Sequence, residues 1–261
     1  MIRSKLKEGN IGNTHGQFRF RGTTNTRIEA LSDGVFAIAT ALLIISSSIP
    51  ETFDQLLVFL DDLVPFAICI TMLILIWFQH YLFFIRYGFK DAKIVAINTL
   101  LLFLILFYVY PLKFLFKVLY EMFPALFSGN QEKLNYLFIE VMPIADAPTL
   151  MVIYGIGAMG IFLTLTLMYW MAYKRRASLD LNEIEIFDTI ASMRSNLLMG
   201  LIPAISVLVS LFRIFGSLSF TISGMIYMSY AFIMPTFGIF AERKRNKILQ
   251  NETEPDNQTT E

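Results

Sequence analysis

The 261-residue chain is 56% hydrophobic and 16% charged, and its 21 basic and 21 acidic side chains leave a formal net charge of zero. Soluble domains are usually about 45–50% apolar and about 25% charged, so this composition excludes an ordinary soluble globular domain. Because the charges balance, the chain lacks the excess of basic residues that is typical of nucleic-acid-binding proteins, and we expect no nucleic acid as a partner.

Residues 1–26 are polar and lack the apolar core of a cleavable signal peptide, so we expect a flexible cytoplasmic tail. Residues 27–47 form the first predicted span, because about 20 mostly apolar residues can cross a bilayer core as a helix. The first two turns of this span nevertheless carry four ionisable or hydroxyl side chains. Such groups at a membrane edge usually pair with one another or face a bundle interior.

The apolar part of the first span is patterned on one side. At about 100° per residue, one face of the predicted helix begins with a single arginine and continues with mostly aliphatic residues. The members of that face are Arg27, Leu31, Gly34, Ile38, Ala41, Leu42 and Ile45. The pattern is compatible with a helix that packs or faces lipid, and equally with a helix that lines a pore.

Five further spans are predicted, at about residues 56–84, 94–112, 148–173, 196–215 and 218–240. Residues 113–147 form the longest connection, and their apolar pieces are too short and too charged to span, so interfacial or loop-packed helices are expected. The fourth span is glycine-rich, which favours close helix packing in lipid. A charged amphipathic segment precedes the fifth span, and the polar tail after the sixth is expected to be disordered.

Six spans place both termini on one side of the membrane. On that side lie 17 of the 21 lysines and arginines, as the positive-inside rule requires of the cytoplasmic face. The predicted organisation is therefore an N-terminal cytoplasmic tail, a six-helix membrane domain and a C-terminal cytoplasmic tail. Their bounds are 1–26, 27–241 and 242–261.

Polar side chains gather at the cytoplasmic edge of the first three spans. They are Arg27, Ser32 and Asp33 on the first span, Trp77 and His80 on the second, and Asn98 on the third. Because the predicted topology puts all of them at one level of the membrane, these side chains can meet.

Within this group, we expect Asp33 to accept a hydrogen bond from Arg27 or His80. The Trp77 indole is expected to donate to Ser32, and the third-span amide to bridge between helices. Such a network in a low-dielectric setting must be fully satisfied to be stable. Pinning three helices together is favoured as its role over a proton relay or an ion site.

The sequence Arg27-Ile-Glu-Ala-Leu-Ser-Asp-Gly resembles the Arg-x-x-x-Phe-Ser-Asp signature of the transmembrane protein 175 family, the lysosomal potassium channels and their prokaryotic relatives. Leu31 stands where that motif has phenylalanine. Trp77-Phe-Gln-His80, Asn98 and the later Pro111 also fit the family pattern, as do six spans and the chain length. The resemblance covers the first three spans, and the last three agree only in number and hydropathy.

The resemblance implies an all-α integral membrane protein that assembles as a homotetramer around a central pore, in a prokaryotic plasma membrane. It implies a cation channel with some potassium selectivity, whose pore is lined by the first helix of each subunit. The narrowest aliphatic ring of the family falls on Ile38, with later rings at Leu42 and Ile45. Many prokaryotic relatives carry threonine where this chain has Ala41, so potassium selectivity is expected to be poor.

The residues agree with this implication on their own terms. Four copies of the first helix around an axis would stack aliphatic rings, and such rings gate by dewetting because a cation sheds water there at a large cost. Val152-Ile-Tyr-Gly155 resembles a TVGYG filter only superficially, and close helix packing is the expected role of that stretch. The expected partners are further copies of the chain, potassium and other monovalent cations, and lipid.

Two other functions stay open. A proton-coupled secondary transporter would use Asp33 and His80, although transporters tend to place such groups at the bilayer midplane. A membrane enzyme would use the same pair, although no nucleophile or metal-ligand set accompanies it. We therefore expect no enzymatic activity, no cofactor, and no metal ion except permeating potassium.

Overall fold

The computed structural model describes residues 18–45, 50–143 and 145–253, and all regular structure in these ranges is helical. In chain order the elements are α2 (Arg27–Ile45), α3 (Phe53–Asp61), α4 (Leu63–Tyr87), α5 (Ala92–Ser128), α6 (Gln131–Tyr136), the π-helical turn η1 (Leu137–Val141), α7 (Ala147–Lys174), α8 (Glu183–Leu211), the 3-10 turn η2 (Gly216–Leu218), α9 (Ser219–Met228) and α10 (Tyr230–Thr253).

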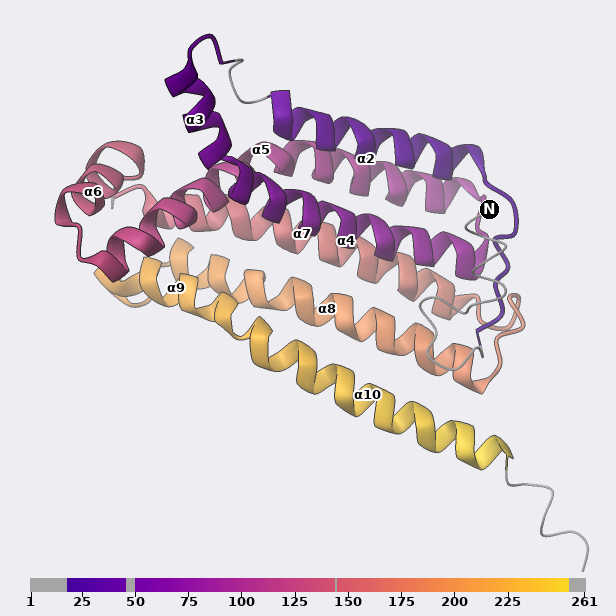
Figure 1. Ribbon diagram of the computed structural model, residues 1–261. Coiled ribbons are helices and arrows are strands. Elements are labelled where there is room, and N and C mark those ends of the chain that lie inside the picture. The colour runs from indigo at the N-terminus through magenta and orange to yellow at the C-terminus, as the bar shows by residue number, and fades with distance from the viewer. Residues whose placement is uncertain (1–17, 46–49, 144, 254–261) are drawn as a thin grey trace, which may run out of the picture.

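The long helices lie side by side and alternate in direction (Figure 1). One end of the bundle holds the starts of α2, α5 and α8 and the ends of α4, α7 and α10, and we call it the Arg27 end. The short helices α3 and α6 lie at the opposite end. α5 packs against α2, α4 and α7, whereas α8 packs against α7, α9 and α10.

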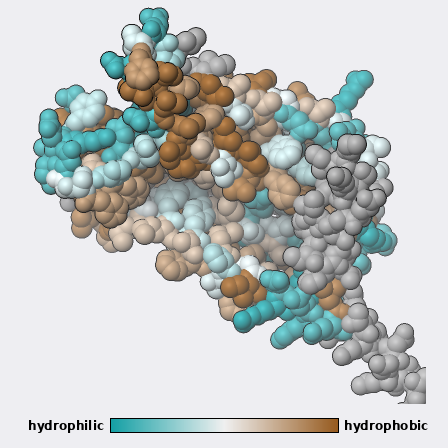
Figure 2. Space-filling model, viewed as in Figure 1, coloured by the Kyte–Doolittle hydropathy of each residue, from teal (hydrophilic) through white to brown (hydrophobic). Residues whose placement is uncertain are grey.

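Five described segments are long and apolar enough to cross a membrane: α4, α5, α7, α8, and the stretch Ser219–Gln250 that α9 and α10 share. α2, with 19 residues and three ionisable side chains in its first two turns, is not among them. Figure 2 shows apolar side chains gathered over α3 and the first half of α4, with hydrophilic side chains around α6 and at the other end. The chain is thus a helical membrane protein, and the predicted six spans stay a prediction.

Several predicted boundaries differ from the structure. The third predicted span ended near residue 112, but α5 continues through Pro111 to Ser128, so part of the expected 113–147 connection is the same helix. The reason is burial, because Val118 of this extension packs with Met142 and Ala147 in a small apolar cluster. The sixth predicted span is two helices, which meet at Ser229.

The predicted polar segments are also more ordered than expected where the structure describes them. Phe18, in the expected flexible N-terminal tail, is only 3% exposed. α8 begins at Glu183, so the charged amphipathic segment and the fifth span form one helix. In the expected disordered C-terminal tail, α10 continues to Thr253, and Arg245 forms an ion pair with Asp188 of α8 at 2.9 Å.

The main core lies between α2, α4, α5 and α7, where aromatic and aliphatic side chains are fully buried. Glycines of α7 permit close approach on two sides. A Cβ on Gly155 would lie 2.2 Å from the side chain of Val207 in α8, and one on Gly157 would lie 2.1 Å from the Tyr108 ring of α5. The close packing expected of this glycine-rich helix is therefore present, and Val152–Gly155 lies within the helix.

Candidate functional site

α2 is packed on one side and uncovered on the other. Phe36, Ala39 and Leu43 are at most 5% exposed, and they pack into the core against α4 and α5. Leu31 and Ile38 are 64% and 55% exposed on the other side. An isolated apolar face of this kind on a helix is a surface for another protein chain or for lipid.

The predicted pore residues are divided between these two sides. Ile38 and Ala41 lie on the uncovered face together with Gly34. Leu42 is half-buried and packs against the core. Ile45 ends α2, and its side chain lies outside the described part of the structure. The uncovered face therefore runs through Ala41 more directly than through Leu42, because α2 is rotated to bury Leu43 and Ala39.

Three of the predicted network residues form a buried chain of hydrogen bonds across three helices. Ser32 of α2, His80 of α4 and Asn98 of α5 are each at most 1% exposed. The Asn98 amide nitrogen donates to the Ser32 hydroxyl at 2.9 Å, and the Asn98 carbonyl oxygen lies 2.7 Å from His80 Nε2. Because the amide oxygen can only accept, His80 Nε2 is the donor. Asn98 is thus the bridge of the network.

The chain of bonds ends on a backbone carbonyl. The Ser32 hydroxyl donates to the carbonyl of Ile28 one turn earlier, at 2.8 Å. The Ser32, His80 and Asn98 side chains therefore each have a hydrogen-bond partner, as a low-dielectric interior requires. This arrangement fixes α2 to α4 and α5 at the Arg27 end, which is the pinning role that the sequence favoured.

The outer pairs differ from those expected. Asp33 accepts from the Trp77 indole at 2.8 Å, and neither Arg27 nor His80 is its partner. Trp77 consequently does not donate to Ser32, and it stacks on Tyr81 with ring centroids 5.6 Å apart. Arg27 is exposed and lies outside these bonds, at the base of the uncovered face of α2. Pairing depends on the rotation of α2 against α4, which the sequence pattern does not specify.

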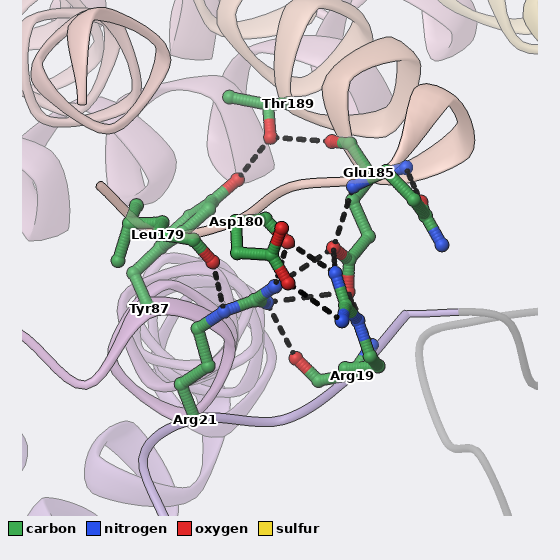
Figure 3. Close-up of polar contacts among 8 residues, drawn as sticks. Arg19, Arg21, Tyr87, Leu179, Asp180, Glu185 and Thr189 are labelled. Carbon is green, nitrogen blue, oxygen red and sulfur yellow. Dashed lines mark hydrogen bonds and ion pairs between the residues drawn. The ribbon is translucent and has the colours of Figure 1, made fainter. Parts of the chain in front are cut away.

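A second polar cluster at the same end was not predicted (Figure 3). The carboxylate of Glu185 has no exposed side-chain surface, and it accepts from Arg19 and Arg21 at 2.9 and 2.8 Å. It also accepts the Arg19 backbone N–H at 2.7 Å. Glu185 completes a capping box with Asn182 at the start of α8. The pattern Asn-x-x-Glu predicts that cap, but nothing in the sequence around Glu185 predicts its contact with the distant arginines.

A third contact joins α5 to α7 at this end of the bundle. Both Nη atoms of Arg175 donate to the Asp91 carboxylate, at 2.7 and 2.8 Å. This bidentate pair holds the pKa of Asp91 below its ordinary value. Arg175 also lies over the Phe89 ring, 5.0 Å from its centroid. The α4–α5 turn is therefore tied to the end of α7.

Comparison with known proteins gives three consistent results. The sequence model of a family described as endosomal/lysosomal potassium channel TMEM175 matches residues 27–108, which hold α2, α3, α4 and the first part of α5. A potassium channel of Marivirga tractuosa is 46% identical over 235 residues, covering 90% of this chain and 94% of that protein. A crystal structure of a variant of the potassium channel MtTMEM175, in complex with a nanobody–MBP fusion, has a TM-score of 0.78 at 45% identity and covers 87% of this chain and 97% of that one.

Proposed function

The chain belongs to the TMEM175 family, and on this premise we propose that it forms a potassium-permeable cation channel. The matches that share nearly half of its residues, the Marivirga tractuosa sequence and the MtTMEM175 structure, are both named as potassium channels. Helices that are long and apolar enough to cross a membrane support a multi-pass channel. The family relation supports the same ion for this protein as for its relatives.

The observation that carries the proposal is the uncovered aliphatic face of α2. One helix face cannot enclose a pore, so several copies are required, and we propose four around a central axis, with α2 crossing the membrane in addition to the five long apolar segments. Ile38 and Ala41 then point inward, and Ile38 forms the narrowest ring. We call this ring the collar. Leu42, at the edge of the face, and Ile45 would contribute the next rings.

A collar of this chemistry replaces a carbonyl filter as the constriction in the proposed channel. Methyl groups cannot substitute for the water around a cation, so a narrow collar dewets and blocks current. Conduction requires either a wider collar or an ion that keeps most of its water. Modest preference for potassium follows, because hydrated ions are poorly distinguished. We place the Arg27 end in the cytoplasm, in line with the distribution of lysines and arginines.

A proton-coupled transporter is less well supported by the contacts. The two residues proposed for proton transfer, Asp33 and His80, are hydrogen-bonded to Trp77 and Asn98, not to each other. Both also lie toward the Arg27 end of their helices, away from the midplane position typical of transport sites.

Ion flux tests the proposed function directly. Purified protein in liposomes should release potassium down its gradient without a co-substrate, at a rate that rises when a protonophore removes the opposing membrane potential. Potassium release is measured with an ion-selective electrode, and protein-free liposomes are the control. Strict one-for-one exchange of potassium with protons without a protonophore, at a rate that the protonophore leaves unchanged, would contradict a channel and favour the transporter.

Substituting Arg27 or Asp33 with alanine is expected to weaken assembly of the tetramer. Both side chains are exposed in the single chain, so a neighbouring copy can reach them. Loss of a charged hydrogen bond costs about 1.5–3 kcal/mol. Subunit number is measured by light scattering or mass photometry in detergent. Lys93→Ala, an exposed change in the first turn of α5, is the control. A stable tetramer after both changes together would exclude the proposed role at the subunit interface.

A further inference from the structure

The N-terminal strap, which we define as residues 18–22, joins two parts of the bundle. On one side its arginines hold the buried Glu185 carboxylate at the start of α8 (Figure 3). On the other side the Gly22 N–H donates to the carbonyl of Ile85 at 2.9 Å, in the last turn of α4. The last carbonyls of a helix have no partner within the helix, and the strap satisfies two of them, because the Arg21 N–H also donates to the Arg86 carbonyl at 3.3 Å.

The fit of the strap against α4 is close. A Cβ on Gly22 would lie 2.3 Å from the carbonyl oxygen of Phe84, so only glycine allows this approach. Phe18 is buried and packs edge to face on Tyr87, with ring centroids 5.8 Å apart. The Arg86 guanidinium lies 4.9 Å from the Phe18 ring centroid. The strap is therefore a packed part of the fold at the position where the chain enters α2.

The strap provides a direct path from α8 to the proposed pore helix. Among the elements that the structure describes, α2 packs against α4 and α5, and α8 packs against α7, α9 and α10, so the two helices do not touch each other. Only residues 23–26 separate the strap from α2. Five chain steps span at most about 17 Å. A shift of the strap can therefore pass through this short link to the first turn of α2.

Glu185 is the anchor of this path. Its two oxygens accept from Arg19 Nε and Nη2, from both Nη atoms of Arg21, and from the backbone of Arg19 and Asn182. A buried carboxylate is stable only when it is paired this completely, and removal of its charge leaves two arginines without their main partner. The other anion near them, Asp180, is largely exposed.

We infer that Glu185 is a positioning residue for the pore: by clamping the N-terminal strap, it holds the start of α2 and resists widening of the collar. This inference rests on the proposed channel. It places a residue that influences channel opening outside the pore. Because the clamp restricts the helix that carries Ile38, its release favours the wider, conducting arrangement. Ile38 itself is unchanged, so the conductance of an open channel and its ion preference should stay the same.

The test is Glu185→Gln, which removes the charge and keeps the size of the side chain. Glu183→Gln is the matched control, because Glu183 lies in the same first turn of α8 but is exposed. In planar bilayers, Glu185→Gln should raise the open probability about fivefold or more, as is typical of a coupled pair of sites. Unitary conductance and the potassium-to-sodium ratio should match the unaltered protein, and Glu183→Gln should leave all three unchanged.

Hydrogen–deuterium exchange provides a readout that does not depend on current. Amides of residues 23–35 should exchange faster in Glu185→Gln than in Glu183→Gln, while amides of α5 stay unchanged. If the exchange rises but neither protein conducts, the clamp is supported and the proposed channel fails. If the exchange and the open probability of a folded Glu185→Gln tetramer both equal those of the control, the inference is wrong.

A covalent tether separates positioning from simple stabilisation. In a Cys69→Ala background, which removes the only native cysteine, Arg21→Cys and Glu185→Cys are joined by a short bis-maleimide. The unlinked pair should show the raised open probability, and the linked pair should return to the value of the background protein. A linked channel that stays as active as the unlinked one would overturn the inference. Arg21→Gln repeats the test if Glu185→Gln fails to fold.

Discussion

Ile38→Asn is expected to raise potassium current through the reconstituted protein by about tenfold or more. A polar ring stays wet, so an ion crossing it keeps more of its hydration. A tenfold gain requires a barrier lower by only about 1.4 kcal/mol. Moving a polar group from water to a surface of methyl groups costs several kcal/mol, and the required change in the barrier is only a small part of that cost. Ion preference should fall at the same time, because a wide, wet collar distinguishes hydrated ions poorly.

Single-channel recording in planar bilayers measures both effects of Ile38→Asn. Ile205→Asn is the matched control, because Ile205 of α8 is 51% exposed, close to the 55% of Ile38, and α8 does not contact α2. Any general effect of an asparagine at the membrane surface should appear in both variants. Unchanged conductance and unchanged ion preference in a tetrameric Ile38→Asn protein would show that Ile38 is not the constriction.

Asn98→Leu is expected to destabilise the protein by about 2–4 kcal/mol. Leucine has a similar volume but leaves the His80 Nε2 proton without its partner, while the Ser32 hydroxyl loses one donor and keeps its bond to the Ile28 carbonyl. An orphaned buried donor costs about 1–3 kcal/mol, and the lost hydrogen bond to Ser32 about 0.5–1.5 kcal/mol. Because the network joins α2 to α4 and α5, the loss should also loosen the start of α2. Equilibrium unfolding in a mild detergent, followed by tryptophan fluorescence or circular dichroism, measures the change.

The neighbouring Thr99 offers a control for Asn98→Leu. Thr99 is exposed, and its hydroxyl bonds only to the Val95 carbonyl of its own helix at 2.9 Å, so Thr99→Val should cost less than about 1 kcal/mol. A second test combines Asn98→Leu with His80→Leu. Replacing both partners with apolar groups should recover part of the stability, because the orphaned donor is gone. Equal stability of Asn98→Leu and the unaltered protein would contradict a network that pins the helices.

Much of the candidate site was predictable because its signals are local. A motif places Ser32 and Asp33 on adjacent positions of one helix, and helix length and direction bring Trp77, His80 and Asn98 to the same level. The Glu185 cluster was not predictable in this way. Its carboxylate and the strap arginines are more than 160 positions apart, and their partnership depends on how the strap, bonded to the last turn of α4, meets the start of α8.

Helix boundaries, too, were predictable only where they depend on local sequence and not on tertiary contacts. The third predicted span ended near residue 112, next to Pro111, and a proline inside a helix removes a backbone donor and usually ends or bends it. α5 nevertheless continues to Ser128, where Val118 gains burial against residues near the start of α7. That gain comes from a tertiary contact, so no window of sequence around the proline reveals it.

Composition, hydrophobic periodicity and the distribution of basic residues by themselves determined that this chain is a helical membrane protein, with a polar group near one end of its first long helices. These properties are local and survive any small change in helix packing. Only the tertiary structure decided that Asp33 pairs with Trp77, that Ile38 lies on the uncovered face of α2, and that the strap binds α8. Each of these depends on the rotation and axial offset of packed helices, and those are set by the close fit of many side chains at once.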